Sequence, residues 1–465
     1  MPVLQENSLA GKAGIEYGIT GMKTRPFFGV EAKVGIVTVL LGGIQHVLAM
    51  FVGIVTPPLL IARALGVDPA TEGFLVSMAL FTSGVTTFIQ VRRWGPLGSG
   101  LLSVQGTSFT FVSLAIQAGR AGGLPLIFGM TVAGAPVEMI LSRFIHFARR
   151  LFPPVVTGSV VMLIGTGLIR VGVLNLAGGA GEPDFGSPAN LGLGLFVMAV
   201  IIVLNRFGKG LLATVSIALG IAAGYLLAAV LGRVDFAPVA AAGAFCLPRP
   251  CRLGIDFDFR YFLPWMIGYL ITTIESIGDL TASSGVSREP VEGPVFIRRL
   301  EGGILADGVG SLLAGLLNAM PNTTFSQNNG VIGLTGVASR RIGYGVAGIL
   351  VLLGFFPRVS ALISVMPKPV LGGATTIMFA MVAVAGLKII ASDGLSVRNQ
   401  FVLAVTLAAG LGIDIAPEAF SRVIERAEAG GIILGSVSAV LRSGLAVGAI
   451  TATVLNLLLP RGETG

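Results

Sequence analysis

Apolar stretches recur along the whole chain, and most have the length of a helix that crosses a bilayer, which is about 20 residues. Short polar loops separate them. The stretches fall at residues 34–53, 72–91, 100–118, 123–146, 153–172, 190–206, 209–231, 260–279, 300–318, 325–337, 342–356, 369–390, 397–413 and 431–459. The pattern predicts an all-α polytopic membrane protein with fourteen transmembrane segments.

The composition supports this prediction. Of the 465 residues, 54% are apolar and 12% are charged, against about 25% charged residues in soluble domains. Mean hydropathy is +0.89. A soluble enzyme, a disordered chain, a disulfide scaffold and a nucleic-acid-binding protein are therefore excluded.

The net charge of +8 is explained by the orientation of the segments. Cytoplasmic loops of membrane proteins are enriched in Lys and Arg. Basic residues gather after the even-numbered segments, at Arg92, Arg93, Arg149, Arg150, Arg206, Lys209, Arg288, Arg298, Arg299, Arg340, Arg341, Lys388 and Arg398. We therefore expect a cytoplasmic N-terminal tail (1–33), which lacks the apolar core of a signal peptide, and a cytoplasmic C-terminal tail (461–465).

The third and tenth segments are interrupted by polar residues and glycine, at 103–109 and 323–330. Unwound backbone survives in a membrane only where protein encloses it or where it lines a cavity. Both segments are third in a set of seven, and two successive sets of seven enter the membrane in opposite directions. This is the inverted-repeat layout of secondary transporters, in which interrupted segments point to the substrate site. The alternative is a pair of glycine-rich packing kinks.

Among the ionisable residues inside apolar segments, four stand out: His46, Glu275, Asp279 and Asp307. A charge near the membrane centre costs at least ~2.5 kcal/mol, so such residues usually serve a function. Glu275 and Asp279 are four residues apart and share a helical face. Because the first and eighth segments are equivalent, we expect Gln45 and His46 to face these two acids. The alternatives are an interhelical hydrogen bond for His46 and helix-end capping for Asp279 and Asp307.

Two loops carry further signals. Cys246 and Cys251 precede the eighth segment, where either a disulfide or two free thiols fits the spacing. Two cysteines and two histidines make no credible metal site. The charged stretch 417–430 has a helical pattern and predicts an amphipathic helix at the outer surface.

Several motifs together resemble the nucleobase–ascorbate transporter family of nucleobase–cation symporters. The run Gln327-Asn328-Asn329-Gly330, followed by Thr335, resembles the family signature. Four further motifs resemble those of the first, third, eighth and ninth segments, and they are Gln45-His46, Gln105 to Phe109, Glu275 to Asp279, and Ala306-Asp307-Gly308. The resemblance extends from about residue 33 to residue 460.

The resemblance implies a fold. Family members have two inverted repeats of seven segments, with short antiparallel strands in segments three and ten. It implies a core domain made of 34–151 and 259–357, and a gate domain made of 152–258 and 358–460. It also implies a homodimer formed through the gate domains.

The resemblance also implies roles for individual residues. The substrate-binding residues would be Glu275, Gln327, Phe109, Ser108 and Ser326, with the two serines offering backbone N–H groups. A carboxylate accepts from the N–H groups of a base, a Gln amide both donates and accepts, and an aromatic ring stacks on the base. Proton coupling would involve Glu275 with Asp279, Asp307, His46 and Gln45. The signature itself contributes Asn328, Asn329, Gly330 and Thr335.

These residues indicate a secondary active transporter that imports xanthine, uric acid or both by proton symport, through alternating access, in a bacterial inner membrane. The proton would be the coupling ion, with no cofactor or metal. Glutamine at position 327 resembles the xanthine and uric acid group, whereas uracil carriers often have glutamate there. A uracil or pyrimidine symporter, sodium coupling and an anion exchanger of the same fold are the alternatives. An enzyme is disfavoured, because no nucleophile–base pair or metal cluster lies within the segments.

Overall fold

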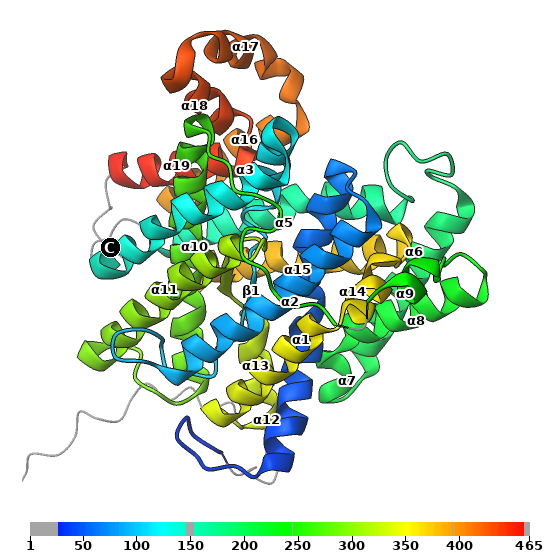
Figure 1. Ribbon diagram of the computed structural model, residues 1–465. Helices are drawn as coiled ribbons and strands as arrows, with labels where there is room; N and C mark the ends of the chain where they lie inside the picture. The colour runs from blue at the N-terminus through cyan, green and yellow to red at the C-terminus, as the bar shows by residue number, and fades with distance from the viewer. Residues whose placement is uncertain (1–26, 146–152, 244, 393, 460–465) are drawn as a thin grey trace, which may run out of the picture.

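The computed structural model describes residues 27–145, 153–243, 245–392 and 394–459. The C-terminal tail and most of the N-terminal tail lie outside this range, as do Arg149 and Arg150. The described chain is mostly helical and carries a single two-stranded sheet (Figure 1).

The first half of the chain comprises α1 (Ile36–Leu65), α2 (Pro69–Arg92), β1 (Gln105–Thr107), α3 (Val112–Leu141), η1 (Ser142–Phe144), α5 (Pro154–Leu176), α6 (Pro188–Phe207), α7 (Leu211–Thr214), α8 (Ser216–Val230) and α9 (Ala237–Ala241). The second half comprises α10 (Phe259–Val286), α11 (Gly293–Leu316), β2 (Asn322–Thr324), α12 (Gln327–Thr335), α13 (Arg340–Phe355), α14 (Pro357–Ser364), α15 (Lys368–Ser392), α16 (Val397–Ile415), η2 (Pro417–Phe420), α17 (Ser421–Ala429), α18 (Gly431–Leu441) and α19 (Gly444–Leu458).

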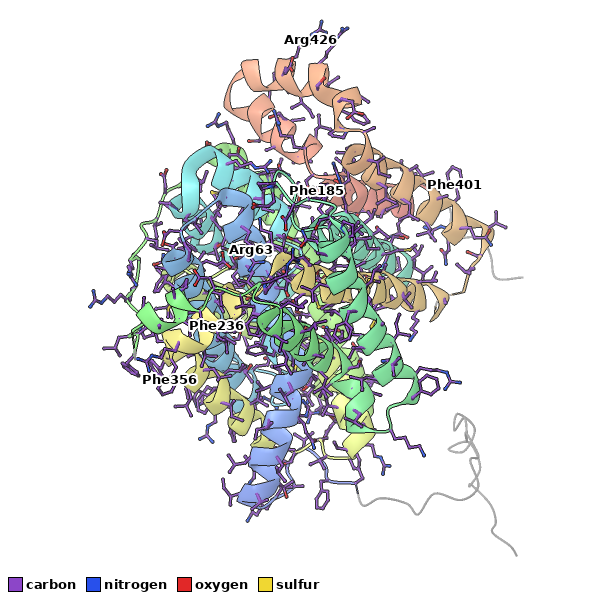
Figure 2. All side chains as sticks on the ribbon, turned by 90° about the vertical axis from the view of Figure 1, so that its right-hand side faces the viewer. Arg63, Phe185, Phe236, Phe356, Phe401 and Arg426 are labelled. Carbon is purple, nitrogen blue, oxygen red and sulfur yellow. The ribbon has the colours of Figure 1, made fainter. Side chains whose placement is uncertain are left out.

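Within the described residues, six helices are individually long and apolar enough to cross a membrane, and up to nine spans result if three sharply bent helix pairs each count as one. Large apolar side chains face outward around the molecule, among them Phe185, Phe356 and Phe401 (Figure 2). Lipid accepts such side chains, whereas water does not. The chain is therefore a multi-pass membrane protein.

Some boundaries differ from those that hydropathy predicted. The first apolar stretch was expected to end at residue 53, but α1 continues through Pro57 and Pro58 to Leu65. In a membrane helix, neighbouring helices can satisfy the backbone groups that proline leaves free. The last stretch, 431–459, was expected to be one segment. It is instead α18 and α19, bent by 97° at the junction.

Segments three and four meet without an intervening loop. The end of the third segment and most of the fourth belong to α3, which is interrupted where Gly122 and Gly123 leave the helical conformation. Gly123 has φ of +71°, a value that favours glycine. The stretch 417–430 is helical as predicted, with η2 followed by α17. Cys246 and Cys251 are both free thiols.

A short helix that hydropathy did not predict, α14, connects α13 to α15. The guanidinium of Arg63, near the end of α1, donates to the carbonyls of Ser364 and Met366 at 2.9 and 3.0 Å. It also pairs with Glu72 of α2 at 3.2 Å. These bonds satisfy carbonyls that a helix end leaves free, and they attach the α14–α15 connection to α1.

The helix pairing follows an internal symmetry. Helix α2, the second segment, packs on α13, the eleventh, and α3, the fourth, packs on α11, the ninth. In a repeat of seven, segment two corresponds to segment nine and segment four to segment eleven. The pairing of two with eleven is therefore equivalent to the pairing of nine with four. Glycines permit both close approaches: a Cβ on Gly84 would lie 2.7 Å from the Ala347 carbonyl oxygen, and one on Gly308 would lie 2.8 Å from Met139 Cγ. The contacts thus have the arrangement of an inverted repeat.

A second group of helices is centred on α5 and α15, the fifth and twelfth segments. Helix α6 packs on α8 and on α15, while α16 packs on α19. Glycines line the α5–α15 contact so closely that a Cβ on Gly165 would lie 2.3 Å from the Ala383 backbone nitrogen.

Candidate binding site at the paired strands

The two interrupted segments meet each other inside the helices. Strands β1 and β2 pair in antiparallel register, with Gly106 opposite Thr323. Two backbone bonds extend the ladder, from Ser108 N to the Pro321 carbonyl at 2.8 Å and from Phe325 N to the Val104 carbonyl at 3.0 Å. The two interrupted segments therefore satisfy each other's backbone N–H and C=O groups, as enclosed strands in a membrane must.

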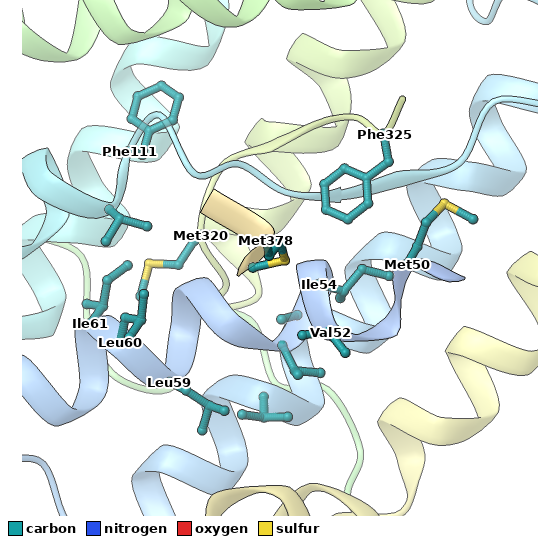
Figure 3. Packing of buried hydrophobic residues seen from close by; sticks show 14 of the residues in the cluster. Met50, Val52, Ile54, Leu59, Leu60, Ile61, Phe111, Met320, Phe325 and Met378 are labelled. Carbon is teal, nitrogen blue, oxygen red and sulfur yellow. The ribbon is translucent and has the colours of Figure 1, made fainter. Parts of the chain in front are cut away.

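Gly106 lets a ring pack directly against the strand. The ring of Phe325 lies beside the extended segment, close to Ile54 of α1 (Figure 3). A Cβ on Gly106 would lie 2.7 Å from Phe325 Cζ and 2.9 Å from Ile54 Cγ1. This apolar packing holds one side of the strand pair and leaves the other to α10.

Three carboxyls of α10 and α11 hydrogen-bond to hydroxyls close to the strands. Thr110 Oγ1 donates to both oxygens of Glu275, each at 3.3 Å. Thr324 Oγ1 donates to Asp279 at 3.0 Å. Their partners come from the ends of β1 and β2, so the two repeats supply one polar cluster.

Asp307 of α11 is fully buried and accepts a hydrogen bond from Ser276 Oγ. Neither this residue nor Asp279 caps a helix end, because both lie inside their helices. The capping alternative for the two aspartates is therefore wrong. Glu275 and Asp279 remain partly exposed, and both accept hydroxyl donors from the strand side.

Helix α12 begins immediately after the strand pair. Ser326 and Gln327 are exposed at its start, and no backbone acceptor for the Ser326 N–H is found among the described residues. The first turn of a helix leaves N–H groups free for a ligand. Open backbone donors and the Gln327 amide thus lie at the end of the strands.

The two asparagines of the signature hold α12 in place. Asn328 donates through Nδ2 to the Leu102 carbonyl. Asn329 accepts from Ser283 Oγ at 2.6 Å and donates to the Asp279 carbonyl at 3.5 Å. One asparagine therefore attaches α12 to the segment before β1, and the other attaches it to α10.

The remaining signature residues shape α12. Gly330 is exposed, and nothing lies within 4 Å of the Cβ it lacks. Thr335 Oγ1 donates to the Val331 carbonyl at 2.8 Å, and Gly336 ends the helix with φ of +69°. Among the described contacts, Thr335 and Gly336 therefore shape the C-terminal end of α12.

His46 has a different neighbour from the one expected. Its buried imidazole lies against the Asn328 side chain, whereas we expected it to face Glu275 and Asp279. The reason is that α12 lies between them, with Asn328 directed to α1 and Asn329 to α10. Gln45 is partly buried on α1.

Ser108 differs from its expected role, and Phe109 has a neighbour that the sequence did not reveal. The Ser108 N–H, expected to meet a substrate, already donates to the Pro321 carbonyl because it continues the strand ladder. The Phe109 ring lies edge-on to Phe379 of α15, with the ring centroids 5.5 Å apart. Phe109 is therefore at the contact between the strand region and the α5–α15 group.

Sequence reasoning missed Thr110, Phe379 and Glu138. A threonine or phenylalanine in an apolar segment is too common to be noticed. Glu138 did carry a signal, because it is a carboxyl inside the fourth apolar stretch. The part of the chain that the structure describes contains no group of three or more His, Cys, Asp or Glu residues arranged to hold a metal ion.

Comparison with solved structures shows the fold. The transmembrane domain of the cyanobacterial bicarbonate transporter BicA aligns with a TM-score of 0.58 at 14% identity, covering 89% of this chain and 96% of that one. The murine Slc26a9 anion transporter, solved in its inward-facing state, aligns with a TM-score of 0.59 at 10% identity, covering 85% and 70%.

Comparison with sequences shows closer relatives. The chain is 42% identical over 434 residues to the xanthine permease XanP of Escherichia coli K12, covering 90% of this chain and 92% of XanP. It is 39% identical to XanQ of the same strain, covering 91% of each. It is 38% identical to the putative purine permease CPE0397 of Clostridium perfringens, covering 94% of each.

A family model described as "Permease family", Xan_ur_permease, matches residues 37–419 and so includes the strand pair, all three carboxyls and α12. Together with the relatives, this match indicates a transporter and not an enzyme. The chain belongs to this permease family, the nucleobase–ascorbate transporters.

Proposed function

We propose that the protein imports purine bases, xanthine or uric acid or both, by proton symport. The observation that carries this proposal is the cluster of carboxyls bonded to the strand ends beside the open first turn of α12. The relatives named as xanthine and purine permeases support the substrate class.

The site offers the groups that a purine needs. Glu275 accepts N–H donors from one edge of the base, and the Gln327 amide both donates to and accepts from the other. The free Ser326 N–H adds a donor to a carbonyl of the base, and Phe109 contributes an aromatic surface worth about 1 kcal/mol. A carboxyl cluster without a cation offers no pocket for a small inorganic anion, so the bicarbonate chemistry of BicA does not carry over.

Transport requires two states of the helices around the site. We assign residues 34–151 and 259–357 to a core domain and 152–258 and 358–460 to a gate domain, with fourteen crossings in all. The α2–α13 and α3–α11 pairings within the core, and α5–α15 within the gate, support this division. The Phe109–Phe379 contact lies where the two domains meet. It is replaced by other contacts when the domains move relative to each other.

The remaining parts of the proposal concern the environment of the protein. Both termini lie in the cytoplasm, because basic residues favour the cytoplasmic side. The membrane is the inner membrane of a bacterium, which the relatives from Escherichia coli support. Two copies associate through their gate domains, whose outer helices expose apolar side chains to lipid or to a partner. Asp279 and Asp307 support the protonation of Glu275.

The experiment that tests this function is uptake of labelled xanthine and uric acid by cells that lack their own purine carriers. We expect uptake of at least one base, and we expect an uncoupler to abolish accumulation because the proton gradient drives it. Uptake unaffected by the uncoupler would contradict proton symport. No uptake of either base by protein present in the membrane would contradict the purine assignment and direct the test to uracil and then to anions.

A second prediction concerns the substrate edge that Gln327 faces. We expect Gln327→Glu to change the order in which purines and pyrimidines inhibit uptake, because a carboxylate accepts but does not donate as an amide does. Losing one hydrogen bond at a binding site costs about 1 kcal/mol or more, a severalfold change in affinity. Competition by a panel of bases measures it, and an unchanged order would place Gln327 outside the site.

A further inference from the structure

A fourth carboxyl lies behind the three at the strand ends. Glu138 of α3 is fully buried, and Thr272 Oγ1 of α10 donates to its Oε1 at 2.9 Å. Its Oε2 has no hydrogen-bond partner among the described residues. A buried polar group with an unsatisfied atom is costly, so helix packing alone does not account for an acid at this position.

Glycines bring Glu138 close to the other acids. A Cβ on Gly308, the residue after Asp307, would lie 3.0 Å from the backbone nitrogen of Met139, the residue after Glu138. A Cβ on Gly134, one turn before Glu138, would lie 2.6 Å from the ring of Tyr269. Glu138 therefore lies where α3, α10 and α11 converge.

The titratable groups that face Glu138 are all acidic. Asp307 of α11 and Glu275 of α10 are close enough to interact with it electrostatically, as is the Tyr269 hydroxyl. Asp279 in turn interacts with Glu275 and Asp307. No ion pair involving any of these four carboxyls occurs in the described part of the chain.

Neighbouring carboxyls that lack a cation cannot all be ionised at low cost. Their protons then belong to the group, and the charge of one acid depends on the charge of the next. A proton can pass between two of them when the O–H bond of one acid breaks as the O–H bond of its neighbour forms, with the charge of the cluster unchanged.

We propose that Glu138 is a positioning residue for proton coupling: it shares the transported proton with Asp307 and Glu275 from behind the site, without touching the substrate. This inference rests on the proposed proton symport and extends it, because it assigns the proton to a cluster that reaches into α3 rather than to Glu275 alone. Thr272 holds the Glu138 carboxyl in place.

The test uses Glu138→Gln in the full-length protein, with initial uptake of labelled xanthine, or of uric acid if that is the base transported, measured against external pH. Removing an acidic neighbour makes the remaining carboxyls less able to hold a proton. We therefore expect the pH profile of uptake to move toward acid by about one unit. Exchange of labelled for unlabelled base at equal pH on both sides stays within about twofold of wild type, because it needs no net proton transfer.

A second variant is expected to shift the pH profile of uptake in the opposite direction. Thr272→Val keeps the Glu138 carboxyl and removes a hydrogen bond that favours its charged form, so the cluster holds its proton more tightly. The profile then moves toward alkaline pH. Glu292→Gln, which alters an exposed carboxyl before α11, is the matched control and leaves the profile unchanged.

Wild-type profiles in both Glu138→Gln and Thr272→Val would overturn this inference while leaving symport intact. If Glu138→Gln does not reach the membrane, an unmoved profile in Thr272→Val alone overturns it. Failure of the proposed function is distinguishable, because it shows in the wild-type protein as uptake that is absent or insensitive to the uncoupler.

Discussion

Glu275→Gln is expected to reduce purine uptake at least about tenfold, and up to about 100-fold, while the protein still reaches the membrane. A hydrogen bond to a charged group contributes about 1.5–3 kcal/mol, and each 1.4 kcal/mol is tenfold in affinity. The substitution removes both the negative charge that accepts from the base and the proton-binding site. The fold tolerates it, because the glutamine oxygen still accepts from Thr110 Oγ1.

The measurement is initial uptake normalised to the amount of protein in the membrane. Glu292→Gln makes the same chemical change at an exposed position outside the strand region and is expected to transport as wild type does. Transport by Glu275→Gln within about threefold of wild type would contradict the assignment, since that difference is below the free energy of one charged hydrogen bond.

Gly165→Ala is expected to destabilise the protein by disrupting the α5–α15 contact. The added Cβ would lie 2.3 Å from the Ala383 nitrogen and 2.6 Å from the Phe379 carbonyl oxygen. Both atoms belong to backbone and cannot rotate away, so α5 and α15 must separate. Overpacking typically costs about 1–3 kcal/mol.

Thermal unfolding in detergent, followed by the fraction of protein that remains monodisperse, measures this effect. The matched control is Gly192→Ala in α6, where nothing lies within 4 Å of the added Cβ. Alanine is the better helix former by about 1 kcal/mol, so the control is expected to be at least as stable as wild type. Equal melting temperatures for the two variants would show that the helices are not in the close contact described.

Gly165→Ala is also expected to affect transport in the protein that survives. Displacing α15 moves Phe379, whose ring lies against Phe109 at the strand region. A change in helix packing on one side of the molecule thus reaches the site through an aromatic contact.

Much of the arrangement was predictable from the sequence, and the reasons are physical. Apolar runs of spanning length located most of the long helices, because lipid imposes apolar residues over a fixed length. The polar runs around Gly106 and Thr323 identified where the helices are interrupted, because unwound backbone in a membrane needs enclosure. The strands themselves were implied only by the family resemblance. Glu275 and Asp307 were recognisable because a buried acid is costly and rarely retained without a function.

The remainder depended on tertiary contacts that hydropathy does not encode. The bend between α18 and α19 occurs at Arg442 and Ser443, a polar interruption too short to divide the apolar stretch when hydropathy is averaged over the length of a span. The partner of His46 depends on α12 lying between two helices. The occupied N–H of Ser108 depends on the register of β1 against β2, which the sequence of either strand alone does not determine.

The strand pair has a mechanical consequence for how the protein can open. Residues from the two halves of the chain are joined at β1 and β2 by a backbone ladder with bonds at both ends, from Ser108 to Pro321 and from Phe325 to Val104. Separating the two halves at this point would leave several backbone N–H and C=O groups without hydrogen-bond partners in a medium without water. Each such group costs several kcal/mol. We therefore expect the two strands to move together as one rigid unit, so that the proposed alternation of access moves this unit relative to the surrounding helices without separating its strands.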